Sequence, residues 1–166
     1  SAFEHGADVE VWTGRHEVSV PGWLPSKSFD TTGDLAAMVG GASADVCLVP
    51  AAISDFAPRK RKGKIPSREG ELTLDLEPTP KVLAALRKAT HGVLVGFKAE
   101  ADVSASELKA KALALLKEAD LDLVVANDVG AVQRDTTAIT IFDRQGRSAS
   151  FAGSKAAAAE QVWRAV

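Results

Sequence analysis

The sequence predicts an α/β protein with a Rossmann-like three-layer fold, a mostly parallel mixed sheet and a C-terminal β-hairpin. Apolar, β-branched runs alternate with helical patterns along the 166 residues, which is typical of βαβ units. Residues 46–49 are apolar throughout, as expected of a strand that is covered on both faces. Residues 138–151 predict a hairpin that turns at residues 143–146, and this hairpin makes the sheet mixed.

The remaining elements follow from local periodicity and from cap residues. Apolar or alternating runs predict further strands at residues 9–13, 45–52, 71–76, 92–98 and 121–126, with 45–52 as the central strand. Residues 15–32 are expected to form a polar loop. Cap residues predict four helices, which begin near residues 32–34, 79–80, 104–106 and 153–154. The second of these should run for roughly ten residues, with a proline in its first turn.

Composition and charge narrow the class of protein. An apolar content of 46% and a charged content of 25% are ordinary for one globular domain, and the net charge of −2 argues against general nucleic-acid affinity. The single cysteine, Cys47, excludes an internal disulfide and is expected to be a structural, buried thiol. The apolar runs are too short to span a membrane, and there is no signal-peptide pattern. A cytoplasmic protein is therefore expected.

The residues after the apolar strand point to nucleotide chemistry. Ligands of parallel sheets bind beyond the carboxyl ends of the strands, which is where Ala51 and Asp55 must lie. The small side chain of Ala51 lets a ligand approach the backbone, and Asp55 offers a carboxylate. Five cations follow closely, enough to neutralise a polyphosphate: Arg59, Lys60, Arg61, Lys62 and Lys64. A solvated charge run is the plainer interpretation of most of them.

Six motifs in register carry a resemblance to a known family. They are AAISDF at 51–56, GKI at 63–65, ELTLDLEPTPKVL at 71–83, VGFKAE at 95–100, LDLVVANDV at 121–129 and GSK at 153–155. Their order and spacing resemble phosphopantothenate–cysteine ligase (phosphopantothenoylcysteine synthetase), a domain of the coenzyme A biosynthesis bifunctional flavoproteins. The resemblance extends from about His5 to Val166.

The resemblance also shows a difference at the front of the chain. The family opens with a strand, a Gly-rich turn and an Asn-containing helix start, whereas this chain begins within that helix. Residues 1–166 are therefore expected to form a single ligase-like domain that lacks the first strand and the Gly-rich turn. The missing segment holds phosphopantothenate in the family. The chain as given is thus expected to bind nucleotide and dimerise without completing the ligation.

The resemblance implies a set of nucleotide-binding residues. Ala51 and Asp55 would contact the nucleotide, and Lys64 would reach its phosphates as the catalytic lysine. Family members carry Pro-Asp-Ile-Val at a helix start near the nucleotide, where this chain has Pro80, Lys81, Val82 and Leu83. For Phe97, stacking on the base and packing in the core are both open interpretations.

Two helix lysines contact the nucleotide in the family, but their register is ambiguous here. Lys117 matches the second, while the first falls on Leu113 unless the helix shifts to use Lys111. The Asn127-Asp128 pair matches a family tripeptide and is at least as often a turn-forming pair. Lys155 is expected at the surface. The three histidines are scattered without metal-ligand spacing, so no protein metal site is expected.

The resemblance implies CTP (or ATP) as cosubstrate with Mg²⁺, 4'-phosphopantothenate and cysteine as substrates, and an acyl-nucleotidylate intermediate. It also implies a homodimer, fused to or associated with a flavin-dependent decarboxylase; residues 71–76 are the interface candidate. Two other functions remain open. One is an NAD(P)- or nucleotide-dependent oxidoreductase on the same fold, against which the absence of a G-x-G-x-x-G fingerprint weighs. The other is a non-catalytic nucleotide-binding or dimerisation fragment.

Overall fold

The centre of the molecule is a five-stranded sheet. The computed structural model describes residues 1–59, 63, 72–131 and 135–166. The strand order is β3-β6-β7-β8-β9, in which the first three strands are parallel and the last two antiparallel. The strands are β3 (Val46–Val49), β6 (Val93–Glu100), β7 (Leu123–Asp128), β8 (Thr136–Asp143) and β9 (Ser148–Ser154). This arrangement confirms the predicted mixed α/β sheet and its C-terminal hairpin.

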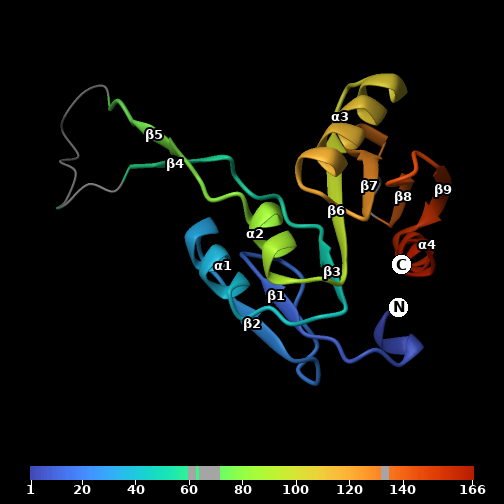
Figure 1. The fold of residues 1–166 in the computed structure, drawn as a ribbon, viewed down its shortest axis with the longest axis horizontal. Coiled ribbons are helices and arrows are strands. Elements are labelled where there is room, and N and C mark those ends of the chain that lie inside the picture. The colour runs from blue at the N-terminus through green and yellow to red at the C-terminus, as the bar shows by residue number, and fades with distance from the viewer. Residues whose placement is uncertain (60–62, 64–71, 132–134) are drawn as a thin grey trace.

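Helices cover both faces of the sheet and complete three layers (Figure 1). Helices α1 (Thr32–Val39), α2 (Val82–Ala89) and α3 (Ala105–Glu118) bury their apolar residues in one core cluster, and α4 (Lys155–Ala165) packs on the opposite face. The α4 face is the smaller core and contains Val95, Val125 and Val162. The two clusters use alternate residues of β6 and β7, because successive side chains of a strand point to opposite faces.

The helix boundaries follow local hydrogen-bond chemistry. Ser104 and Glu107 form a capping box at α3, in which each satisfies the other's backbone amide group. Thr31 and Asp34 form the same box at α1, so the cap is one residue earlier than predicted. Ser154 caps α4 as expected. Helix α2 begins at Val82, two residues after Pro80, and has eight residues.

A partly buried arginine holds α2 against the sheet. The guanidinium of Arg87 donates to the Asp122 carboxylate (2.9 Å) and to the carbonyl oxygens of Thr90 (2.6 Å) and Gly92 (2.8 Å). Asp122 also accepts from the amide of Leu94 in β6 (2.8 Å). This network fixes the C-terminal end of α2 beside the start of β6. The N-terminal end of α2 therefore points toward the edge of the sheet at which the parallel strands end.

Two small strand pairs lie outside the main sheet. Strands β1 (Val11–Thr13) and β2 (Ser26–Ser28) pair in parallel, while β4 (Phe56–Pro58) and β5 (Leu76–Pro78) form an antiparallel arm. The arm extends away from the body of the molecule (Figure 1). Short 3-10 turns occupy Phe3–His5 and Val129–Ala131. His5 of the first turn contacts Glu160 of α4.

The structure corrects three strand predictions. Strand β3 is at the edge of the five-stranded sheet instead of its centre, and Leu48 is 40% exposed. The predicted loop 15–32 contains β2, whose polar residues gave no strand signal. The strand predicted at 71–76 is wrong for the part described: residues 72–75 are irregular, and β5 covers only Leu76–Pro78. Residue 71 lies outside the described residues.

Within the described residues, no helix is long and apolar enough to cross a membrane. The Cys47 thiol packs against the larger core, and burial raises its pKa. A protonated, partly buried thiol is unreactive, which agrees with the structural role expected for it.

Candidate active site

A cavity of about 1500 Å³ opens beyond the carboxyl ends of β3 and β6. The loop after β3, the start of α2, the C-terminal half of β6 and parts of α3 and α4 form its walls. This is the edge of a parallel sheet at which ligands are expected to bind. Eight of the predicted site residues line it: Ala51, Asp55, Pro80, Lys81, Val82, Leu83, Phe97 and Lys111.

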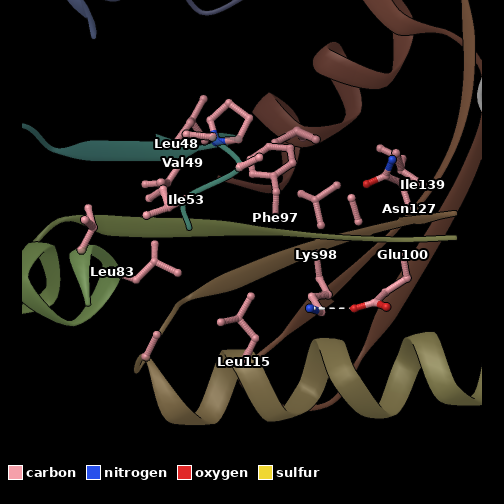
Figure 2. Close-up of a pocket in the computed structure, with 18 of the residues that line it drawn as sticks. Leu48, Val49, Ile53, Leu83, Phe97, Lys98, Glu100, Leu115, Asn127 and Ile139 are labelled. Atoms are coloured by element: carbon pink, nitrogen blue, oxygen red, sulfur yellow. Dashed lines mark ion pairs between the residues drawn. The ribbon is translucent and has the colours of Figure 1, made fainter. Parts of the chain in front are cut away.

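Strand β6 divides the cavity into two differently built halves. Phe97 points to the α4 side of the strand, whereas Lys98 and Glu100 point to the α3 side (Figure 2). Asn127 of β7 and Ile139 of β8 lie on the same side as Phe97, and Leu83 and Leu115 lie on the side of Lys98 (Figure 2). We call these halves the α4-side and α3-side chambers.

Ion pairs dominate the α3-side chamber. The Glu100 carboxylate accepts from the Lys98 ammonium through one oxygen (2.7 Å) and from the Lys111 ammonium through the other (2.7 Å). The hydrogen bond from Lys111, followed by that from Lys98, lowers the pKa of Glu100 to about 2. The carboxylate is therefore ionised at any physiological pH, and both lysines are held beside it.

Three contacts join the loop after β3 to the residues before α2. They lie where the arm leaves the cavity wall, a place that we call the mouth of the cavity. The Lys81 ammonium binds the Asp55 carboxylate (2.6 Å), and this hydrogen bond and charge lower the pKa of Asp55 and raise that of Lys81. The Thr79 hydroxyl donates to the Ser54 carbonyl (2.5 Å), and the Thr79 amide donates to the Asp55 carbonyl (2.9 Å). Asp55 and the first residues of α2 are thus fixed against each other.

The start of α2 adds unpaired backbone donors to this mouth. Lys81 is the N-cap of the helix, and its side chain makes no capping hydrogen bond, because it extends to Asp55 instead. The first amide groups of a helix lack intrahelical partners and favour an anion through the helix dipole. Pro80 and Val82 are in the wall of the cavity, so this helix start faces a possible ligand.

The α4-side chamber is mainly apolar. Phe97, Val125, Ile139 and Val162 form its inner wall, with the packed side of α4 beyond them. The side-chain amide of Asn127 lies among them, and no hydrogen bond joins it to another residue in the described part of the chain. An amide in such surroundings offers both donors and an acceptor to a ligand.

The structure separates the two lysines that the sequence left in competition. Lys111 lines the cavity and contacts Glu100. Lys117 is on another face of the same helix, is exposed and does not line the cavity. Lys155 is exposed, as expected, and also lines the cavity on the α4 side. Lys64 lies outside the described residues.

Sequence reasoning missed Glu100 and undervalued Asn127. Both lie at the carboxyl ends of strands whose side chains alternate toward the cavity, so the period-two pattern of VGFKAE and of LVVAND contained the signal. Among the described residues there is no group of three His, Cys, Asp or Glu side chains that is able to hold a metal ion.

Comparison with known proteins identifies the family. The profile of the DNA/pantothenate metabolism flavoprotein C-terminal domain matches residues 1–166. The chain belongs to this family. The coenzyme A biosynthesis bifunctional protein CoaBC of Thermococcus kodakarensis is 32% identical over 162 residues, which are 93% of this chain and 40% of that protein. The chain thus spans less than half the length of this relative.

Solved structures share the fold. The DNA/pantothenate metabolism flavoprotein from Streptococcus pneumoniae superposes with a TM-score of 0.83 at 19% identity, over 98% of this chain and 82% of that one. A Cab2 mutant in complex with phosphopantothenate-cysteine superposes with a TM-score of 0.63 at 24% identity, over 80% of this chain and 47% of that one. These similarities confirm the predicted Rossmann-like architecture.

Proposed function

We propose that this domain carries out the nucleotide-dependent ligation of 4'-phosphopantothenate to cysteine in coenzyme A biosynthesis, with CTP as the nucleotide. The observation that supports this function best is that Lys81, Lys98, Lys111 and the start of α2 line one cavity in a member of this family. Clustered ammonium groups and backbone amides are the chemistry that binds a polyphosphate.

In this proposal the phosphates of CTP occupy the α3-side chamber. Lys98 and Lys111 donate to phosphate oxygens, and the amide groups at the start of α2 meet the same charge. Asp55 binds the nucleotide at the mouth, with the Ala51 backbone against it. Phe97 provides a ring on which the base stacks, and the Asn127 amide pairs with a polar edge of the ligand.

Lys64 completes the proposed phosphate site from the segment after β4. It lies outside the described residues, so its role rests on the GKI motif alone. Changing Lys64 to Ala should weaken CTP binding by roughly 1.5–3 kcal/mol, the value of a hydrogen bond to a charged group. The melting temperature should hardly change. Equal affinities for the wild type and the variant would assign Lys64 to the solvated charge run.

The reaction we propose proceeds in two substitutions. The phosphopantothenate carboxylate attacks the α-phosphorus of CTP, which forms the acyl-nucleotidylate and releases pyrophosphate. The cysteine amine then attacks the acyl carbon, loses a proton and displaces CMP, leaving the amide. No histidine of the described residues lines the cavity, so the protein contributes orientation and charge neutralisation more than proton transfer.

The donor set is compatible with Mg²⁺ carried by the nucleotide. Mg²⁺ keeps several waters and commonly binds through substrate phosphates plus one or two carboxylates. Asp55, which is largely exposed at the mouth, is one carboxylate of the cavity wall that suits this purpose, although it must exchange its contact with Lys81. The ion would supply charge neutralisation to the phosphates.

We also propose that the domain is a homodimer and works with a flavin-dependent decarboxylase, as the bifunctional name of its relative suggests. The arm exposes large apolar side chains that a partner surface would bury: Phe56, Leu72, Leu74 and Leu76, each at least half exposed. Exposed apolar patches of this kind commonly mark protein contacts. Sedimentation equilibrium of the wild type and of Leu74→Glu tests the dimer, which the charged variant should dissociate.

Calorimetric titration with CTP, ATP and NAD in the presence of magnesium tests the nucleotide. The family resemblance predicts that CTP binds more tightly than ATP. NAD should bind weakest, because the chamber offers cations for a triphosphate and the sequence contains no Gly-rich dinucleotide turn. Preference for ATP would keep the ligase and change the nucleotide. Tightest binding of NAD would replace the ligase with an oxidoreductase.

A further inference from the structure

Glu100 holds two candidate phosphate-binding lysines at once. Its Oε1 contacts the Lys98 ammonium and its Oε2 contacts the Lys111 ammonium, both at 2.7 Å. The lysines come from different elements, β6 and α3, so the carboxylate joins the strand to the helix across the α3-side chamber. Its side chain is 19% exposed, against 33% for Lys98 and 46% for Lys111. The carboxylate is thus the most enclosed member of the three.

The carboxylate is also the most rigidly placed. Strand β6 pairs with β7 as far as Glu100, which is in register with Asp128, whereas its pairing with β3 ends at Gly96. A glutamate side chain is shorter than a lysine side chain, so its charged end stays closer to the backbone of the strand that carries it. The two flexible ammonium groups are therefore located by the glutamate, and without it they would separate because like charges repel.

The geometry leaves donors available for a ligand. Each ammonium has three N–H bonds and gives one to Glu100, so both retain donors that are not used by this carboxylate. Two lysines against one glutamate leave the group with net positive charge. Protein kinases use a similar arrangement, in which a glutamate of one helix holds a strand lysine that binds the nucleotide phosphates.

We propose that Glu100 is a positioning residue that holds Lys98 and Lys111 as a two-ammonium cradle for the phosphate chain of the nucleotide. This inference rests on the proposed function and adds a residue to it. Glu100 does not touch the phosphates; it acts through the two lysines. Its effect should therefore depend on how many phosphates the ligand carries.

A purely electrostatic role of Glu100 would change nucleotide affinity in the opposite direction. If Glu100 acted only as a negative charge near the phosphates, its neutralisation would strengthen nucleotide binding. Glu118 provides the matched control, because it also lines the cavity and faces Lys81 but makes no ion pair with Lys98 or Lys111. Glu100→Gln and Glu118→Gln each remove one negative charge and keep the size of the side chain.

The experiment is calorimetric titration of CTP and CMP, with magnesium, into the 166-residue chain and both variants. Glu100→Gln should weaken CTP binding about tenfold, equivalent to about 1.4 kcal/mol, and should change CMP binding by much less. Glu118→Gln should leave CTP binding unchanged or slightly tighter. Unchanged or tighter CTP binding by Glu100→Gln would overturn the positioning role while leaving the proposed nucleotide site intact.

A measurement without ligand separates this inference from the proposed function. Ammonium groups held by a carboxylate give observable proton–nitrogen NMR correlations for lysine side chains, whereas freely solvated ones exchange too fast. The wild type should show correlations for Lys98 and Lys111 that disappear in Glu100→Gln and persist in Glu118→Gln. Their absence in the wild type would overturn the cradle. A wild type that shows them but binds neither CTP nor ATP would overturn both the cradle's purpose and the nucleotide site.

Discussion

The two chambers beside β6 are formed by consecutive residues of one strand and yet have opposite chemistry. On the α3 side, Lys98 and Glu100 belong to an ion-pair group that also includes Lys111. On the α4 side, Phe97 packs among valines and an isoleucine, with Asn127 as the polar group at hand. The contrast shows how the alternation of a single strand places a charged surface and an apolar one within reach of the same ligand.

The difference also separates stability from binding. Apolar contacts of the α4 side belong to a core cluster, so their loss should appear mainly in the free energy of unfolding. The charged groups of the α3 side are substantially solvated, so their loss should appear mainly in nucleotide affinity. Four measurements test this separation.

Phe97→Ala should have the largest effect. Replacing a buried phenylalanine with alanine costs about 3–5 kcal/mol, and because Phe97 is only partly buried we expect about 2–3 kcal/mol of unfolding free energy. Urea denaturation measures this loss. Phe97→Leu is the control, since it retains most of the apolar volume and should lose less than about 1.5 kcal/mol. If the leucine variant also lost CTP affinity, the ring would be shown to contact the base.

Lys111→Ala should be next, and its effect should be on binding. Loss of a charge-assisted hydrogen bond predicts CTP binding weaker by about 1.5–3 kcal/mol, with little change in unfolding free energy. Lys117→Ala on the same helix is the matched control and should bind CTP as the wild type does. The reverse result would place Lys117 at the phosphates and would move the register of α3 away from the one described.

Asn127→Ala should have a smaller effect. Its amide makes no hydrogen bond to another described residue, so its removal leaves no protein group unpaired, and stability should change little. Ligand binding should weaken by about 0.5–1.5 kcal/mol, as for one neutral hydrogen bond. A drop in the melting temperature without any change in affinity would make Asn127 a turn-forming residue, as its sequence motif allows.

The smallest effect is the pH dependence contributed by Glu100. Its pKa of about 2 in the folded protein lies below the ordinary 4.5, so the folded state favours the ionised form. The resulting stability is present above pH 4.5 and is lost as the pH falls toward 2. The difference in denaturation midpoint between the wild type and Glu100→Gln should therefore shrink over this range. A constant difference would mean that the carboxylate is not stabilised by its lysines.

The fold was predictable where local chemistry decides structure. The Ser104–Glu107 capping box and the hairpin turn, which contains Gly146 at φ +77°, each depend on a few consecutive residues. The sequence therefore predicts both to within a residue or two. Strand β3 was found but misplaced. Its apolar side chains predict cover on both faces, whereas in the structure Cys47 and Val49 face the core and Leu48 faces the cavity.

The site was predictable as a set of motifs more than as a set of contacts. The motifs located Asp55, Lys81 and Phe97 at one edge of the sheet because strand ends gather there. Motif spacing did not choose between Lys111 and Lys117, since that choice depends on which helix face meets β6. It also did not reveal Glu100, because an ion pair between a strand and a helix has no signature in either segment alone.

The alternation of side chains along β6 determines which sequence changes this strand tolerates. Most point substitutions in the strand alter one chamber and leave the other in place. The gain or loss of a single codon between Val93 and Glu100 is different, because it turns every following side chain to the opposite face and carries Phe97 or Lys98 into the wrong chamber. Because β6 pairs with β3 over residues 93–96 and with β7 over residues 95–100, such a slip would break the register with its neighbours. Sequence length in these eight residues should therefore vary far less than sequence identity.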